Sequence, residues 1–159
     1  MTTALYPGSF DPITNGHLDI IKRASSIFDK VVIGVYDIPL KSLLFTADER
    51  VDLVKKSVAD YKNVEVRAYS GMTVEFARQM NAKVVVRGLR ASSDFEREFE
   101  MALMNKKLAP DVELMCFMAN LRYQFLSSSL LKEIIKLGGN LDDMVPAHVC
   151  AALKKKLLN

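Results

Sequence analysis

KVVIGVY, at residues 30–36, is a short and almost unbroken apolar run in which valine and isoleucine predominate. Such a run is typical of a strand that is covered on both faces, as the strands of a parallel sheet are. The run KVVVR at residues 83–87 repeats the pattern, and further runs predict strands at residues 3–6, 63–67 and 112–117. The sequence therefore predicts five strands of the parallel kind.

Longer stretches with a different period separate these runs. Their apolar residues recur at intervals of three and four, which predicts helices. The predicted helices cover residues 17–28, 47–61, 73–81, 92–108, 128–137 and 146–158, the last with Pro146 in its first turn. Alternating strands and helices predict an α/β fold, namely a Rossmann-like, doubly wound, five-stranded parallel sheet with helices on both faces and C-terminal helices. No linker rich in Pro, Gly or Ser interrupts the pattern, so residues 1–159 are expected to form a single domain.

The composition excludes several classes of protein. With 159 residues, 50% of them apolar and 26% charged, the chain can bury a core, which excludes a disordered protein. The net charge of +3 is too small to indicate a nucleic-acid partner. No apolar run approaches the roughly 20 residues that cross a bilayer, and no leading signal segment is apparent, so a cytoplasmic protein without a membrane partner is expected. Cys116 and Cys150 lie in apolar segments at a spacing that matches no zinc or redox motif, and buried, unreactive thiols are expected.

Ligands of an open parallel sheet bind beyond the carboxyl ends of its strands, so residues that carry chemistry are expected in the segments that follow the strands. Three segments stand out: residues 6–17 (YPGSFDPITNGH), 85–90 (VVRGLR) and 125–130 (FLSSSL). Each combines residues that allow unusual backbone paths with polar donors. Neither GxxxxGK[ST] nor GxGxxG occurs in the chain, so a phosphate site of another class is indicated.

The first of these segments predicts a phosphate site at a helix start. Gly8 is expected to let the chain turn sharply, and Gly16 to allow close approach of the backbone. His17 then lies in the first helical turn, where free amides and the helix dipole attract phosphate and disfavour imidazolium. A neutral histidine that donates one hydrogen bond is therefore expected. The alternative for an isolated Gly-His pair is a residue that merely begins a helix.

The tetrad Thr14-x-Gly16-His17 resembles the [HT]xGH signature of the nucleotidyltransferase superfamily, which also includes cytidylyltransferases and class I aminoacyl-tRNA synthetases. The strings PGSFDPITNGH, VVRGLR and LSSSLLKE resemble bacterial phosphopantetheine adenylyltransferases in order and spacing, across essentially the whole chain. The resemblance implies transfer of an adenylyl group from ATP to 4′-phosphopantetheine, giving 3′-dephospho-CoA and pyrophosphate in the penultimate step of coenzyme A synthesis (EC 2.7.7.3). Direct in-line attack without a covalent intermediate is expected, because the acceptor phosphate is already anionic.

The same resemblance implies roles for individual residues. The catalytic residues are His17, Lys41 and Arg90, with His17 stabilising the pentavalent transition state and Lys41 contacting the acceptor phosphate. Lys132 aligns with the cation of the superfamily's second signature. The acceptor is expected to contact Ser9, Lys41, Thr73 and Arg87. ATP is expected to contact Ser9, Phe10, His17, Gly88, Leu89, Arg90, Glu98, Tyr123, Gln124, Phe125, Leu126, Ser127, Ser128 and Ser129.

Magnesium is expected with the triphosphate, held mainly by phosphates and water, and no metal site of protein residues is predicted. The resemblance also implies a homohexamer with CoA as a feedback inhibitor, and the apolar helix around Phe99, Met101 and Met104 is a candidate for the contact. The expected small-molecule partners are ATP, 4′-phosphopantetheine and dephospho-CoA. His148 is expected to be a partly buried scaffold residue.

Two other functions remain open at this point. One is a related nucleotidyltransferase with a different acceptor, such as nicotinamide mononucleotide, against which the VRGLR and SSSLLKE strings argue. The other is a non-catalytic sensor that binds adenine nucleotide without turnover. The intact Thr14, Gly16, His17 and Lys41 argue against that sensor.

Overall fold

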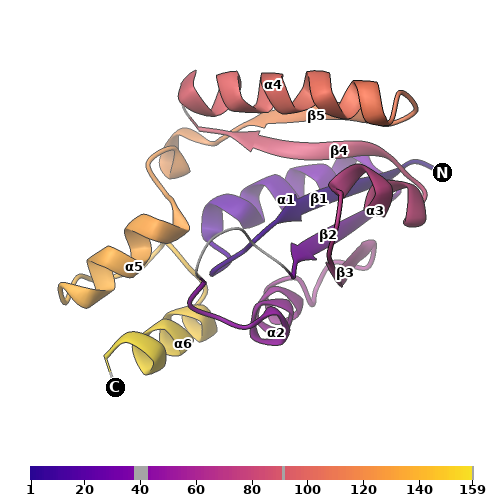
Figure 1. The fold of residues 1–159 in the computed structure, drawn as a ribbon. Helices are drawn as coiled ribbons and strands as arrows, with labels where there is room; N and C mark the ends of the chain where they lie inside the picture. The colour runs from indigo at the N-terminus through magenta and orange to yellow at the C-terminus, as the bar shows by residue number, and fades with distance from the viewer. Residues whose placement is uncertain (38–42, 91, 159) are drawn as a thin grey trace.

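The computed structural model of the chain describes residues 1–37, 43–90 and 92–158 (Figure 1). Lys41, one of the residues expected in the site, lies outside these ranges. None of the helices in the described ranges is both long and apolar enough to span a bilayer.

A single sheet of five strands runs through the centre of the molecule. The strands are β1 (Thr3–Gly8), β2 (Lys30–Tyr36), β3 (Val64–Tyr69), β4 (Ala82–Leu89) and β5 (Glu113–Met118). They are all parallel, in the order β3-β2-β1-β4-β5. The predicted five-stranded, doubly wound sheet is thus confirmed, and each predicted strand lies within two residues of the observed bounds.

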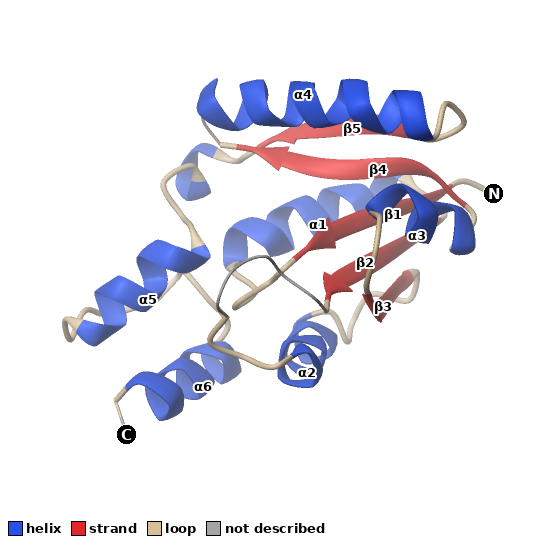
Figure 2. Ribbon diagram, in the orientation of Figure 1, coloured by secondary structure: helices blue, strands red, loops and turns tan. Residues whose placement is uncertain are grey.

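The helices follow the strands as the sequence predicts (Figure 2). They are α1 (Asn15–Ile27), α2 (Ala47–Ser57), α3 (Thr73–Gln79), α4 (Ser92–Leu108), α5 (Ser128–Lys136) and α6 (Ala147–Leu157), with a short 3-10 helix η1 (Leu121–Tyr123) that the sequence did not predict. The predicted end of α2 at residue 61 is wrong, because the chain turns after Ser57, where the N–H of Tyr61 donates to the carbonyl of Val58. Pro146 is the N-cap of α6 rather than a residue of its first turn.

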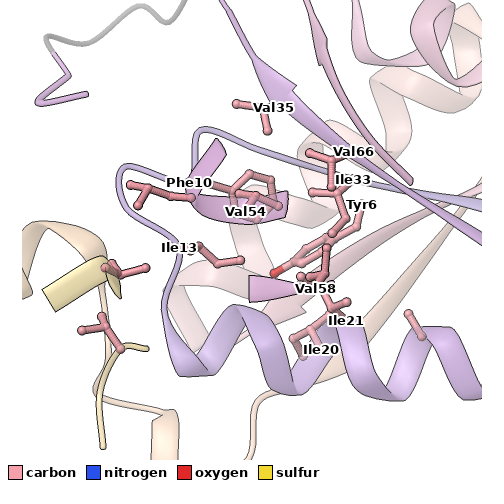
Figure 3. Close-up of a cluster of buried hydrophobic side chains, with 14 of the residues drawn as sticks. Tyr6, Phe10, Ile13, Ile20, Ile21, Ile33, Val35, Val54, Val58 and Val66 are labelled. Carbon is pink, nitrogen blue, oxygen red and sulfur yellow. The ribbon is translucent and has the colours of Figure 1, made fainter. Parts of the chain in front are cut away.

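Helices cover both faces of the sheet. On one face, α1, α2, α5 and α6 enclose the larger core, part of which is drawn in Figure 3. On the other face, α3 packs over Leu5, Val32 and Val85, while α4 lies along β4 and β5. His148, in α6, is partly buried as expected, and its Nε2 atom lies 3.1 Å from the hydroxyl of Ser57 in α2.

The edge strand β5 departs from the prediction that every strand is covered on both faces. Met115, Cys116 and Met118 are exposed, and Cys116 is therefore not the buried thiol that was expected, while Cys150 is partly buried. The reason is that β5 has a neighbouring strand on one side only, and α4, which lies along it, is itself poorly covered. Phe99 in that helix is 54% exposed. The apolar residues of α4 and β5 therefore form an uncovered surface.

Candidate active site

The carboxyl ends of β1 and β4 lie side by side at the point where the strand order reverses, with β2 and β3 on one side and β5 on the other. Ligands of open parallel sheets bind at such a point, because the loops leaving the two strands diverge and leave a crevice. Residues 9–14, which we call the first loop, leave β1 there. Residues 125–130 lie against both the first loop and the end of β4. Ser128 Oγ donates to the carbonyl of Pro12 at 2.8 Å, and Arg90 Nη1 donates to the carbonyl of Leu126 at 3.0 Å.

His17 is fixed through the Nδ1 atom of its ring. Its backbone N–H donates to Oγ1 of Thr14 (3.2 Å), and the backbone N–H of Thr14 donates to Nδ1 (3.0 Å), so the two residues form a capping box at the start of α1. Since Nδ1 is an acceptor, we infer that the ring proton lies on Nε2. Nε2 has no hydrogen-bond partner in the described part of the chain, which leaves its N–H for a ligand.

The electrostatic surroundings keep the ring of His17 neutral. Burial, and then the positive charges of Arg90 and Arg87, lower the pKa of His17 to about 4. Arg87 lies near the carboxyl end of β4, and Arg90 directly follows that strand. At neutral pH His17 is therefore a hydrogen-bond donor through Nε2, as the sequence predicts, and it carries no charge of its own.

Phe10 supports the imidazole from the interior. Phe10 is 2% exposed, within the buried cluster of Figure 3. Its ring lies edge-on to the ring of His17, with 5.1 Å between the centroids. Any contact between Phe10 and ATP would therefore use its backbone. Gly8 does not have the positive φ that a sharp glycine turn requires, so the expected reason for this glycine was wrong. A Cβ atom at Gly8 would lie 3.0 Å from the Phe10 ring, and close packing is what requires glycine there.

Arg87 and Gly88 are neighbours on β4 and face opposite sides of the sheet, as successive strand residues do. The guanidinium of Arg87 donates to both carboxylate oxygens of Glu98 in α4, at 2.9 and 2.6 Å. A Cβ atom at Gly88 would lie 3.4 Å from Ile20 in α1. Side chains on opposite faces of the sheet therefore border the crevice. We call the part on the face of α1 the α1 half of the site, and the part on the face of α3 and α4 its other half.

Arg90 belongs to the half beside α1. Its Nε atom pairs with the carboxylate of Asp94 at 3.0 Å, and its bond to the carbonyl of Leu126 ties β4 to the segment before α5. Leu89 is buried, as is Leu126, so these two residues offer a ligand their backbones rather than their side chains.

The segment before α5 lies against the start of α1. A Cβ atom at Gly16 would lie 3.4 Å from the Cβ of Tyr123, which confirms the predicted close approach at this glycine. Tyr123 is partly buried, whereas Gln124 and Phe125 are exposed. Residues 123–126 thus border the α1 half of the site.

The three serines at the start of α5 have different environments. Ser127 is the N-cap and accepts from the N–H of Leu130, Ser128 donates to the first loop, and Ser129 is exposed. The first turns of α1 and α5 contain no acidic residue, unlike that of α2. Because acidic side chains do not neutralise these helix ends, their N–H groups and dipoles are suited to an anion.

Thr73 begins α3 and lies in the other half. Its Oγ1 atom forms a hydrogen bond of 2.9 Å with the hydroxyl of Tyr69. Burial raises the pKa of Tyr69, while the bond to Thr73 and the charge of Arg87 act in the opposite direction. Arg87, bonded to Glu98 in α4, lies on the same face of the sheet as α3. Thr73 and Arg87, both expected to contact the acceptor, therefore share one half of the site.

The sequence reasoning missed two buried charged residues, Asp11 and Arg50. Arg50 is 1% exposed and donates to three carbonyls, those of Ser9 (2.8 Å), Tyr36 (2.7 Å) and Phe45 (3.2 Å). It thereby joins the first loop to both described ends of the stretch between β2 and α2. A signal existed, because Arg50 precedes the buried Leu53 and Val54 by three and four residues and so belongs to the buried face of α2.

The carboxylates around the site are already engaged by cations. Asp11 pairs with Lys132, Asp94 with Arg90, and Glu98 with Arg87. Within the described ranges, no group of three or more His, Cys, Asp or Glu side chains is placed to hold a metal ion. A magnesium ion at this site would therefore take its ligands from the phosphates of a bound nucleotide and from water.

Comparison with known proteins adds three findings. The family model described as cytidylyltransferase-like matches residues 5–134. A phosphopantetheine adenylyltransferase of Clostridium tetani is 53% identical over 159 residues, which cover 100% of this chain and 99% of that protein. Proteins of the same name from Dehalococcoides mccartyi (strain CBDB1) and Roseiflexus castenholzii are 52% and 53% identical, and each alignment covers at least 97% of both chains.

Proposed function

Since the chain belongs to the cytidylyltransferase-like family and, within it, to the phosphopantetheine adenylyltransferases, we infer that its site transfers the adenylyl group of ATP to 4′-phosphopantetheine, with dephospho-CoA and pyrophosphate as products. One observation carries the chemistry. A neutral imidazole with a free Nε2–H lies at the start of α1, near two guanidinium groups and the start of α5. This arrangement supplies fixed donors where negative charge develops in phosphoryl transfer.

The half beside α1 is proposed to bind ATP. Its donors are the Nε2–H of His17, the amides at the starts of α1 and α5, the hydroxyl of Ser129 and the guanidinium of Arg90. Gly88 and the backbones of residues 123–126 are proposed to border the nucleotide. The contact of Glu98 with ATP stays a proposal from the sequence, and its bond to Arg87 supports a role in orienting that arginine.

The half beside α3 and α4 is proposed to bind the acceptor. Arg87 and Thr73 lie there, and an apolar hollow of about 300 Å³ lies on the same face of the sheet, lined by Val74, Val85, the later part of α4 and the start of β5. A charged group beside an apolar hollow suits a phosphate that carries a long pantetheine arm. Lys41 lies outside the described residues, and its contact with the acceptor phosphate stays a proposal from the sequence, as does that of Ser9.

The reaction is proposed to proceed in one displacement. A phosphate oxygen of the acceptor attacks the α-phosphorus of ATP, the bond from that phosphorus to the bridging oxygen breaks, and pyrophosphate leaves with the electron pair. No protein base is needed, since the attacking oxygen is already anionic. His17 donates its hydrogen bond to the phosphate oxygens as their charge increases. A magnesium ion, bound by phosphates and water, would neutralise part of that charge.

A homo-oligomer, with a hexamer as the specific expectation, is proposed from the uncovered surface of α4 and β5. The exposed large apolar residues there are Phe95, Phe99, Met101, Leu103, Met104, Leu108, Met115 and Met118. A contiguous apolar surface of this kind marks a protein contact, because exposing it to water is unfavourable. Sedimentation velocity should show an assembly that Phe99→Glu disperses, whereas a monomeric wild type would refute the proposal.

Three further expectations are proposals of the same kind. CoA contains the whole dephospho-CoA group of the product, so it is proposed to bind the same site as a feedback inhibitor. The chain is proposed to act in the cytoplasm, where ATP and a reducing medium are present, in keeping with its free Cys116 and Cys150. Residues 1–159 are proposed to act as one nucleotidyltransferase domain.

A pyrophosphate-release assay with ATP and 4′-phosphopantetheine tests the function, with magnesium present and absent. Turnover that depends on 4′-phosphopantetheine supports it. Turnover with nicotinamide mononucleotide in place of 4′-phosphopantetheine would establish a different acceptor. Binding of ATP without release of pyrophosphate, measured by calorimetry, would establish a sensor and refute the proposed reaction.

A further inference from the structure

The carboxylate of Asp11, in the first loop, is buried and holds three partners. Its Oδ1 atom accepts from the N–H of Phe45 (2.9 Å), and its Oδ2 atom accepts from the N–H of Leu44 (3.0 Å) and from Nζ of Lys132 (2.7 Å). Only 3% of the Asp11 side chain is exposed, against 23% for Lys132. The acid is therefore an interior group, whereas the ammonium that it holds stays open to the outside.

Lys132 lies on the face of α5 that contacts the first loop. It follows Ser128 by four residues, so the two side chains project from the same face of the helix. Ser128 donates to Pro12, and Lys132 donates to the adjacent residue, Asp11. Of the three N–H bonds of the ammonium, the one to Asp11 leaves two for other acceptors.

The surroundings of Asp11 hold it rigidly. Phe45, whose N–H bonds to Asp11, uses its carbonyl to accept from Nε of the buried Arg50, and Arg50 also donates to the carbonyl of Ser9, in the same loop as Asp11. The carboxylate is thus fixed from two directions before any ligand arrives. A group held in this way can orient a flexible lysine, whose side chain would otherwise adopt many rotamers.

We propose that Asp11 is a positioning residue: it directs the ammonium of Lys132 toward the phosphates at the start of α5 and thereby acts on adenylyl transfer without touching the substrates. The proposal rests on the proposed function, since it needs a triphosphate in the α1 half of the site. It differs from a structural ion pair in one consequence. If Asp11 acts through Lys132, its replacement matters for kcat only while the lysine is present.

A double-mutant cycle tests this consequence. Asp11→Asn, Lys132→Met and the double variant are compared with the wild type for kcat at saturating ATP and 4′-phosphopantetheine, and for thermal stability. Asp111→Asn is the matched control, because it removes an exposed acid that pairs with Arg78 in α3, outside the site. We expect Lys132→Met and Asp11→Asn each to lower kcat about tenfold or more, and Asp111→Asn to leave it unchanged.

The outcomes separate the two claims. In the Lys132→Met background, Asp11→Asn should change kcat by less than about twofold, because groups that act as a unit are not additive. A further loss of tenfold in that background would overturn the proposal, since Asp11 would then act through residues 44–45. If Asp11→Asn does not fold, Asp11→Glu replaces it in the cycle with the same two outcomes. A wild type without adenylyl transfer would refute the proposed function, whereas an active wild type with additive losses refutes this inference alone.

Discussion

Replacing His17 by alanine should lower kcat about 100- to 1000-fold and change the KM for ATP far less. The ring is held by the N–H of Thr14 at Nδ1, so its Nε2–H is directed before substrate binds. A donor fixed in this way strengthens its bond as charge accumulates on the transferred phosphate. It therefore contributes mainly to the transition state and little to the ground state.

The magnitude follows from the kind of hydrogen bond that is lost. Removing one preorganised donor to a developing oxyanion costs about 2.7–4 kcal/mol, which is a factor of about 100 to 1000 in rate. Because the ring is neutral, no full charge is lost with it, and a larger effect is not expected. The variant also loses one half of the capping box with Thr14, which should lower the free energy of unfolding by about 1 kcal/mol.

The assay is continuous detection of pyrophosphate with both substrates varied. His148→Ala is the matched control, since it removes the other histidine, which lies between α6 and α2, and its kcat should equal that of the wild type. A loss smaller than tenfold in His17→Ala, or a loss confined to the KM for ATP, would refute the role assigned to the Nε2–H.

Three other predictions concern stability and the second half of the site. The pKa of His17 falls from 6.5 to about 4 on folding, so between these pH values the unfolded chain binds more protons than the folded one. The free energy of unfolding should therefore fall by up to about 3 kcal/mol as the pH is lowered from 6.5 to 4. In thermal melts, the Tm of His17→Ala should depend less steeply on pH than that of the wild type. Arg87→Ala should raise the KM for 4′-phosphopantetheine at least tenfold, which is the effect expected from losing one charge-assisted hydrogen bond. A change confined to the KM for ATP would place Arg87 in the half of the site beside α1. Arg50→Met should lower the free energy of unfolding by about 3 kcal/mol, measured by urea denaturation, because the carbonyls of Ser9, Tyr36 and the buried Phe45 lose their donor. An unchanged midpoint would contradict that.

Local patterns account for most of the secondary structure. The run at residues 30–36 became β2 without any change of bounds, because a strand with β-branched residues and apolar positions on both faces is stable only inside a sheet. The failures occurred where coverage depends on another element. β5 is as apolar as the other strands, yet most of it is exposed. The hydrophobic pattern of a strand does not show whether that strand lies at the edge of the sheet.

The candidate site divides in the same way. The motif around Gly16 and His17 was readable because helix capping is local: Thr14 and His17 are three residues apart and form their bonds within one turn. The sequence also predicted that His17 would be neutral, since a helix start disfavours imidazolium. The numerical shift of its pKa, however, includes charges from β4 that only the folded chain brings close.

By itself, the sequence determined the fold class, since the strand and helix periods are local, and its resemblance to known motifs indicated the family. Only the tertiary structure decided which charges are paired. Asp11 and Lys132 are 121 positions apart, and Ser9 and Arg50 are 41 apart, so no local pattern joins them. Whether a charged side chain is a solvated surface group or a buried hydrogen-bonded one depends on the distance to its partners and on the exclusion of water, and both exist only once the chain has folded.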